Sequence, residues 1–144
     1  MKKLLLAMVL VSGAAFAKPE IAIKDPWVRL MPPTSKVSAA YMKIENKGNS
    51  EDVLLWAKSS VSKITQLHKT ITKNGIMKMV RVRKFVIKPG QTFILKPGGY
   101  HIMLIDLKHP LKKGEKVTLW LKFKYSGMKT VSYTHLTLPT NREV

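Results

Sequence analysis

The sequence contains no cysteine, few acidic residues and only one long hydrophobic run. Without cysteine, the chain has no disulfide framework, no thiol nucleophile and no thiolate metal site. Asp and Glu account for 8 of its 144 residues against 26 Lys plus Arg, which gives a formal net charge of +18 at pH 7. The hydrophobic fraction of 45% excludes a disordered polybasic chain. Length and composition therefore predict a single globular domain with a basic surface.

The one long hydrophobic run lies at the N-terminus. Two lysines precede an apolar stretch at residues 4–14, and Ala15-Phe16-Ala17 has the small-x-small spacing of a cleavage site. This run is shorter than the ~20 apolar residues that cross a bilayer. We therefore predict that residues 1–17 are a secretory signal peptide. The mature chain is expected to begin at Lys18, to have a net charge of +16, to be exported and to have no transmembrane segment.

The rest of the chain alternates short strand-like segments with turn signals and shows no helical period. Alternation is clearest between residues 116 and 124, where one face carries only apolar side chains and Trp120 falls on the other. The apolar face comprises Val117, Leu119, Leu121 and Phe123. The pattern predicts one all-β domain over residues 18–130, an antiparallel sandwich or barrel of the Greek-key kind. The expected strands are residues 21–30, 39–44, 52–57, 62–72, 76–87, 92–95, 100–107 and 116–125.

The C-terminal end fits this pattern less well. Its sequence Val-Ser-Tyr-Thr-His-Leu resembles the translation of a sequencing-library adapter. We therefore predict that residues 131–144 are a non-native tail, and His135 is left out of the candidate functional residues.

With thiols absent, the groups that could bind a metal are histidines and methionines. His101 and Met103 are two residues apart on a predicted strand, so their side chains share one face about 6 to 7 Å apart. Met77 and Met79 form a second such pair after a turn expected at residues 74–75, and His68 precedes that turn. Imidazole and thioether together form a soft, neutral ligand set, which favours Cu(I) over Mg²⁺ or Ca²⁺.

Each of these residues has a commoner role when it is considered alone. A methionine on a strand usually fills an irregular gap in the core. A histidine beside a turn is usually a hydrogen-bonded surface residue. We assign such ordinary roles to His109, Met31, Met42 and Met128.

The joint spacing of four residues is more specific than any of them alone. His68 is followed by ten residues and Met79, then by twenty-one residues and His101, then by one residue and Met103. In this spacing the chain resembles the periplasmic copper chaperones called PCu(A)C. Blocks that resemble the family in the same order surround these positions, at residues 25–29, 39–42, 74–79 and 97–104.

The resemblance implies that His68, Met79, His101 and Met103 coordinate one Cu(I) near the surface of a cupredoxin-like β-barrel, with Met77 as the nearest substitute ligand. It also implies a carrier, not an enzyme, that delivers copper for assembly of the dinuclear copper centre of cytochrome c oxidase. The acceptor would be oxidase subunit II or a Sco-type protein. We expect a monomer that does not bind nucleic acid.

Two other functions are alternatives to a copper carrier. A copper oxygenase would need a histidine as its first residue, whereas the predicted cleavage leaves Lys18. A secreted basic β-sandwich could instead bind an anionic polymer or protein partner through Lys78, Arg81, Arg83 and Lys84, although a solvated basic face is the plainer explanation. The sequence contains no nucleophile elbow, zinc-protease motif or phosphate-binding loop that would indicate an enzyme.

Overall fold

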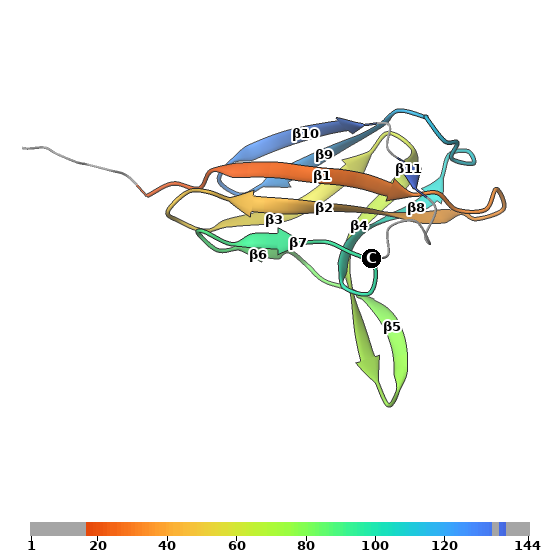
Figure 1. Cartoon of the computed structure of the whole chain (residues 1–144), viewed down its shortest axis with the longest axis horizontal. Helices are drawn as coiled ribbons and strands as arrows, with labels where there is room; N and C mark the ends of the chain where they lie inside the picture. Colours follow the sequence, from red (N-terminus) through yellow and green to blue (C-terminus); the bar gives the residue numbers. More distant parts are fainter. Residues whose placement is uncertain (1–16, 134–135, 138–144) are drawn as a thin grey trace, which may run out of the picture.

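The computed structural model describes residues 17–133 and 136–137, which form strands, turns and loops. A seven-stranded sheet has the order β11-β1-β2-β8-β4-β5, with β7 paired to β2, and a four-stranded sheet has the order β10-β9-β3-β6 (Figure 1). Within the described ranges, no helix could span a membrane. The strands are β1 (Ile21–Arg29), β2 (Val37–Asn46), β3 (Asp52–Ser59), β4 (Ser62–Lys73), β5 (Ile76–Arg81), β6 (Phe85–Ile87), β7 (Thr92–Ile94), β8 (Tyr100–Leu107), β9 (Val117–Phe123), β10 (Gly127–Tyr133) and β11 (Leu136–Thr137).

The two sheets confirm the predicted antiparallel sandwich. Every strand pair is antiparallel except the short β1–β11 pair. The sheets do not close into a barrel, because each has free edges, at β11 and β5 in the larger sheet and at β10 and β6 in the smaller.

The core lies between the two sheets and matches the alternation seen in the sequence. All four apolar residues expected on one face of β9 are fully buried, whereas Trp120 on the other face is 36% exposed. The larger sheet contributes buried side chains from β2 and β8, among them Met42, Ile102 and Leu104. Met42 therefore has the core role expected of it.

The single strand expected over residues 76–87 is wrong. The chain forms β5 up to Arg81, leaves that sheet, and forms β6 from Phe85 in the other sheet. Phe85 is 1% exposed and stacks on Phe93 with ring centroids 4.9 Å apart. Burial of this aromatic ring explains the crossing, since a continuous strand would leave it on the exposed edge of the sheet.

Strand β10 was not among the expected strands, the last of which ends at residue 125. Its seven residues pair with β9 from Gly127 opposite Phe123 to Tyr133 opposite Val117. It includes the first three residues of the segment 131–144, whose non-native origin stays a prediction. Residues 1–16, 134–135 and 138–144 lie outside the described residues, and with them most of the signal peptide and His135.

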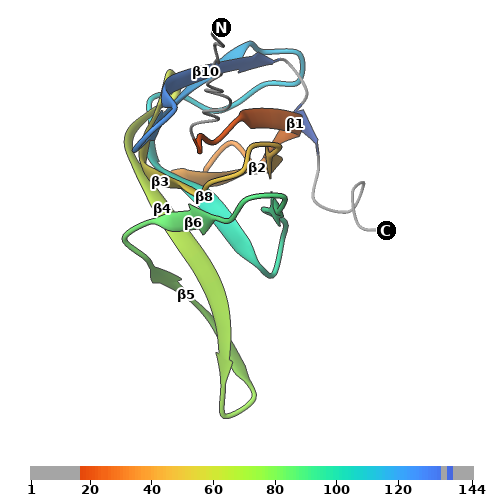
Figure 2. The same ribbon diagram turned by 90° about the vertical axis from the view of Figure 1, so that its left-hand side faces the viewer.

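Strands β4 and β5 form a hairpin that extends away from the sandwich (Figures 1 and 2). Strand β4 pairs with β8 only as far as Lys69, and beyond that residue it pairs with β5 alone. Asn74 and Gly75, at the tip, have φ angles of 54° and 79°. Two residues with positive φ between paired strands form a type I′ turn, which confirms the turn expected there. We call residues 69–81 the β4–β5 arm.

Asn46, at the end of β2, joins three parts of the sandwich through one buried amide. Its Oδ1 accepts hydrogen bonds from the backbone N–H groups of Glu20 (3.1 Å) and Gly48 (3.0 Å). Its Nδ2 donates to the carbonyl groups of Ser50 (2.8 Å) and Ile87 (3.1 Å). The Asn46 side chain is fully buried, and its bond to the Ile87 carbonyl is buried as well, whereas the other three bonds are partly buried.

Replacing Asn46 with alanine is expected to lower the free energy of unfolding by about 2–4 kcal/mol, because four backbone groups, one of them in a buried bond, lose a hydrogen bond together. Urea denaturation followed by tryptophan fluorescence measures the change. Asn49→Ala is the matched control, because Asn49 is exposed and its Oδ1 accepts one hydrogen bond, from the backbone N–H of Lys18. Equal losses in the two variants would contradict the assignment of Asn46 as a buried junction.

Candidate metal centre

Two histidines from neighbouring strands form the centre of the candidate site. His68 of β4 lies directly opposite His101 of β8 in the antiparallel register, so both side chains project from the same face of the sheet. Their ring centroids are 5.6 Å apart. His101 is 2% exposed, whereas His68 is partly buried.

The two methionines of the predicted set lie on the same face, one on each side of the histidine pair. Met103 of β8 is opposite Gln66, and Met79 of β5 is opposite Thr70. Gln66 and Thr70 are each two residues from His68, so both methionines are diagonal neighbours of the pair. Met103 packs against the core, whereas Met79 is 53% exposed on the β4–β5 arm.

Each histidine donates one ring N–H to an oxygen atom two residues before it. His101 Nδ1–H donates to the Gly99 carbonyl at 3.1 Å, and His68 Nε2–H donates to Gln66 Oε1 at 2.9 Å. The other two ring nitrogens, His101 Nε2 and His68 Nδ1, are buried and have no partner. Metal-bound histidines are typically held in this way, with one nitrogen donating and the other free to coordinate.

The surroundings of both histidines favour the neutral imidazole. Burial is the main cause that lowers the pKa of His68, and repulsion from His101 when it is protonated, and from Arg81, lowers it further. Burial also lowers the pKa of His101, where the hydrogen bond to Gly99 opposes the effect and the charge of Arg29 adds to it. A neutral imidazole can bind a metal ion without first losing a proton.

A pocket of about 210 Å³ opens beside His101. Tyr41 forms part of its wall, with its ring centroid 6.3 Å from that of His101 and 4.5 Å from that of Trp27. The guanidinium carbon of Arg29 lies 5.9 Å from the centroid of the Tyr41 ring. The pocket is lined by Arg29, Tyr41, Thr70, Met77, Lys78, Met79, Pro97, Gly98 and His101.

Some residues of this site were not identified from the sequence. Gln66 and Gly99 orient the two imidazoles, and each is two residues from its histidine on the same strand or just before it. That spacing is a signal that could have found Gln66, because residues two apart on a strand share a face. Tyr41 lies in one of the blocks that resemble the family, and nothing in the sequence indicated that its ring lies beside His101.

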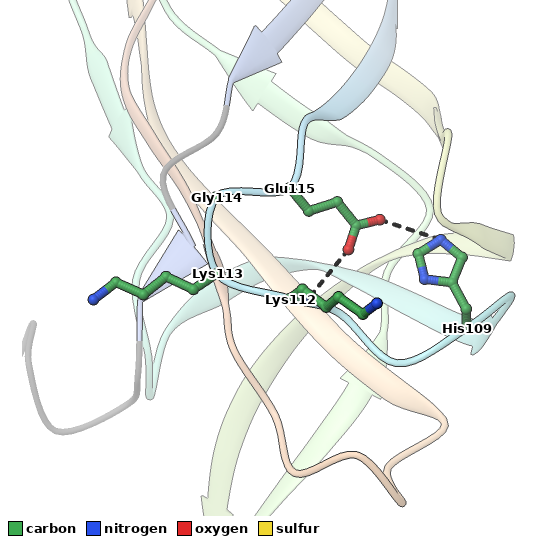
Figure 3. A pocket seen from close by; sticks show the side chains of 5 residues that line it. All are labelled: His109, Lys112, Lys113, Gly114 and Glu115. Carbon is green, nitrogen blue, oxygen red and sulfur yellow. Dashed lines mark hydrogen bonds and ion pairs between the residues drawn. The ribbon is translucent and has the colours of Figure 1, made fainter.

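His109 lies apart from this site, in the loop between β8 and β9. Its Nε2 is 3.1 Å from Glu115 Oε2, in a hollow also lined by Lys112, Lys113 and Gly114 (Figure 3). The ion pair fits the ordinary role expected of His109. Among the residues described here, no three or more His, Cys, Asp or Glu side chains gather into a metal-binding group.

Comparison with known proteins gives related sequences. The family model "Putative lipoprotein LpqE-like" matches residues 21–134. "Putative lipoprotein Lxx21020" of Leifsonia xyli subsp. xyli is 38% identical over 113 residues, which cover 78% of this chain and 67% of that protein. The chain therefore spans about two thirds of the length of this relative.

Solved structures of PCuAC domains are similar to the sandwich. The copper-bound PCuAC domain of PmoF2 has a TM-score of 0.70 at 23% identity, covering 86% of this chain and 97% of that domain. The Cu(I) form of DR1885 from Deinococcus radiodurans has a TM-score of 0.62 at 32% identity, covering 90% of this chain and 84% of that protein. The first likeness concerns the fold alone, whereas the second includes related sequence.

The lowered histidine pKa values predict how stability depends on pH in the copper-free protein. Below the ordinary value of 6.5, the unfolded chain takes up protons at His68 and His101 before the folded chain does. Stability is therefore present above pH 6.5 and falls with decreasing pH until the folded-state pKa values are reached. Urea denaturation between pH 7.5 and 5 measures this slope.

His101→Gln is expected to have a shallower loss of stability over this pH range, whatever its stability at pH 7.5. Asn49→Ala serves as the control, since Asn49 is exposed and its amide does not titrate, and it should keep the parent slope. A parent slope retained in His101→Gln would show that burial of this imidazole does not disfavour its charged form.

Proposed function

This chain belongs to the LpqE-like family of PCuAC domains, and we propose that it is an exported carrier that binds one Cu(I) ion and passes it to an acceptor protein. The observation that carries the proposal is the pair of facing imidazoles, each with one buried nitrogen that has no partner. Support also comes from DR1885, whose structure was determined in a Cu(I) form.

The proposed ligands are His68, Met79, His101 and Met103. This donor set is neutral and soft, so it favours Cu(I), whereas Cu(II) prefers nitrogen and oxygen donors in tetragonal geometry. No carboxylate is among the ligands, which disfavours Mg²⁺ and Ca²⁺. Met77 lines the same pocket as Met79 and is the nearest substitute ligand.

The proposed ligands differ in exposure, and this difference favours transfer of copper to an acceptor. His101 is almost fully buried and is oriented by Gly99, whereas Met79 is half exposed on the β4–β5 arm. A ligand from the acceptor can displace the thioether of Met79 while the histidines still hold the ion. Copper then changes partner by ligand exchange and is never released into water.

The proposed destination of the copper is the dinuclear centre of cytochrome c oxidase, with subunit II or a Sco-type protein as the acceptor. The resemblance of the four-residue spacing to the periplasmic chaperones supports this assignment. Export to the periplasm is supported by the signal-like pattern of residues 1–17 and by a relative that is named as a lipoprotein. We propose a monomeric, non-enzymatic protein.

An anaerobic titration of Cu(I) against a chromogenic chelator tests the site. The parent is expected to bind one equivalent, and Met79→Ala/Met103→Ala is expected to bind at least about 100-fold more weakly, because two of four ligands are lost. Met128→Ala is the control, since Met128 is 48% exposed on β10, in the other sheet. Binding that is indifferent to Met79 and Met103 would overturn the ligand assignment.

Transfer to a defined acceptor tests the carrier role. Cu(I)-loaded protein mixed with the copper-free soluble domain of oxidase subunit II should lose its copper faster than a small chelator of matched affinity. The reason is that ligand exchange inside a docked complex avoids waiting for release of the free ion. Equal rates from the protein and from the chelator would contradict a carrier that docks on this acceptor, and the same assay with a Sco-type domain compares the two proposed acceptors.

A further inference from the structure

The segment that contains the candidate copper ligands has no negative charge. Between Val53 and Ile105 the chain has ten Lys or Arg residues and no Asp or Glu, and all four candidate ligands lie in this segment. The eight acidic residues of the chain are therefore all outside it, which concentrates positive charge on one part of the sequence. A one-signed surface of this kind raises the local concentration of oppositely charged partners.

The structure places five exposed cations, half of the ten, on the β4–β5 arm and the segment that follows it, and the half-buried Lys69 lies at the base of the arm. None of the five is in the ion pairs of the described residues, whose cationic members are Lys24, Lys43, Lys47 and His109. The gathered cations are Lys73, Lys78, Arg81, Arg83 and Lys84.

Exposed apolar side chains lie among these cations, on both faces of β5. On β5, Ile76 is 67% exposed, Met77 is 62% exposed and Met79 is 53% exposed. Because the arm extends clear of the sandwich, this mixed surface is reachable from more than one side (Figure 2). Exposed apolar side chains interspersed with unpaired charges are typical of a surface that binds a partner of opposite charge.

Bound Cu(I) would make this surface more positive still, because its proposed ligands are all neutral. Strand β5 is a free edge, yet Lys78 and Arg81 lie on it, and charged side chains on an edge strand disfavour the addition of another strand. Docking through side chains is therefore favoured over extension of the sheet.

From these observations we infer that the β4–β5 arm, continued to Lys84, is the docking surface for the copper acceptor, and that the acceptor presents carboxylates around an apolar contact. The inference rests on the proposed function for the partner's identity as a copper acceptor. The surface itself is identified by its exposed cations and exposed apolar side chains, independently of copper. Met79 lies within it, so docking would bring the acceptor to the most exposed of the proposed ligands.

Binding of an acidic probe to the copper-free protein tests the surface without relying on copper. The probe is a fluorescein-labelled peptide in which glutamates flank two leucines, and its affinity is measured by fluorescence anisotropy at low and physiological salt. The test variant is Lys73→Gln/Arg83→Gln/Lys84→Gln, which leaves Lys78 and Arg81 unchanged because they lie beside the candidate copper site. The matched control, Lys108→Gln/Lys112→Gln/Lys113→Gln, removes the same charge from exposed lysines of the β8–β9 loop, of which Lys112 and Lys113 are drawn in Figure 3.

We expect the arm variant to lose at least about tenfold in affinity at low salt and the control less than about threefold, because close charges contribute more than distant screened ones. Ile76→Ser should also weaken binding, and a probe with glutamine in place of glutamate should not bind. Equal losses in the arm and control variants would overturn the inference, since net charge alone would then explain binding. Unchanged thermal unfolding of each variant excludes misfolding as a cause.

Two further measurements separate the docking surface from the proposed carrier function. The arm variant should bind Cu(I) as the parent does but transfer it at least about tenfold more slowly to an acidic copper-free acceptor domain, with the control variant near the parent rate. Normal transfer by the arm variant would overturn the inference and leave the carrier function standing. Conversely, arm-dependent probe binding by a parent that binds no Cu(I) would overturn the carrier function and support the surface.

Sedimentation with vesicles of phosphatidylglycerol and phosphatidylcholine tests whether the arm binds an anionic membrane instead of an acidic protein. Vesicle binding that is lost in the arm variant, together with probe binding that is equal in the arm variant and the parent, would show a membrane surface and overturn the inference. Vesicle binding equal in the arm and control variants would support it.

Discussion

The pairing of β4 with β8 is the constraint on which the rest of the site depends. A shift of one residue in this register would turn His68 to the core face of the sheet and remove it from His101. The opposite face fixes the register, because Leu67 and Ile102 are paired across the same strands and are both buried in the core. Burial of Leu67 and Ile102 on one face of the sheet therefore fixes the position of His68 opposite His101 on the other face. The same strand pairing stabilises the sandwich and sets the geometry of the candidate site.

Local patterns in the sequence predicted the parts of the fold that depend on local chemistry. Alternation identified the buried face of β9, Asn74-Gly75 identified the tip of the arm, and a period of two placed His101 and Met103 on one face. Pairing between strands distant in sequence was not visible in this way, so nothing local placed His68 opposite His101. Only the family spacing joined them. The crossing between β5 and β6 was missed for the same reason, since it depends on where Phe85 is buried in the other sheet.

The scarcity of acidic residues around the site has two effects that act together. A carboxylate near the ring nitrogens of His68 and His101 would stabilise their protonated forms and compete with a metal ion for them. It would also offer hard oxygen donors, which favour Mg²⁺ and Ca²⁺. Surroundings with only neutral and cationic groups therefore favour neutral imidazoles and soft metal ions at once, and they leave a surface to which anions are drawn.

The orientation of the two histidine rings and the distance between them have different structural causes. In Gln66-Leu67-His68 and Gly99-Tyr100-His101, the group that orients each ring lies two residues before it. Ring orientation is therefore a property of a tripeptide, whereas the distance between the rings is a property of the sheet. This difference can be used in protein design. Two such tripeptides grafted onto facing positions of another antiparallel sheet would bring oriented imidazoles with them. The recipient scaffold would then need to supply only the distance between the two rings.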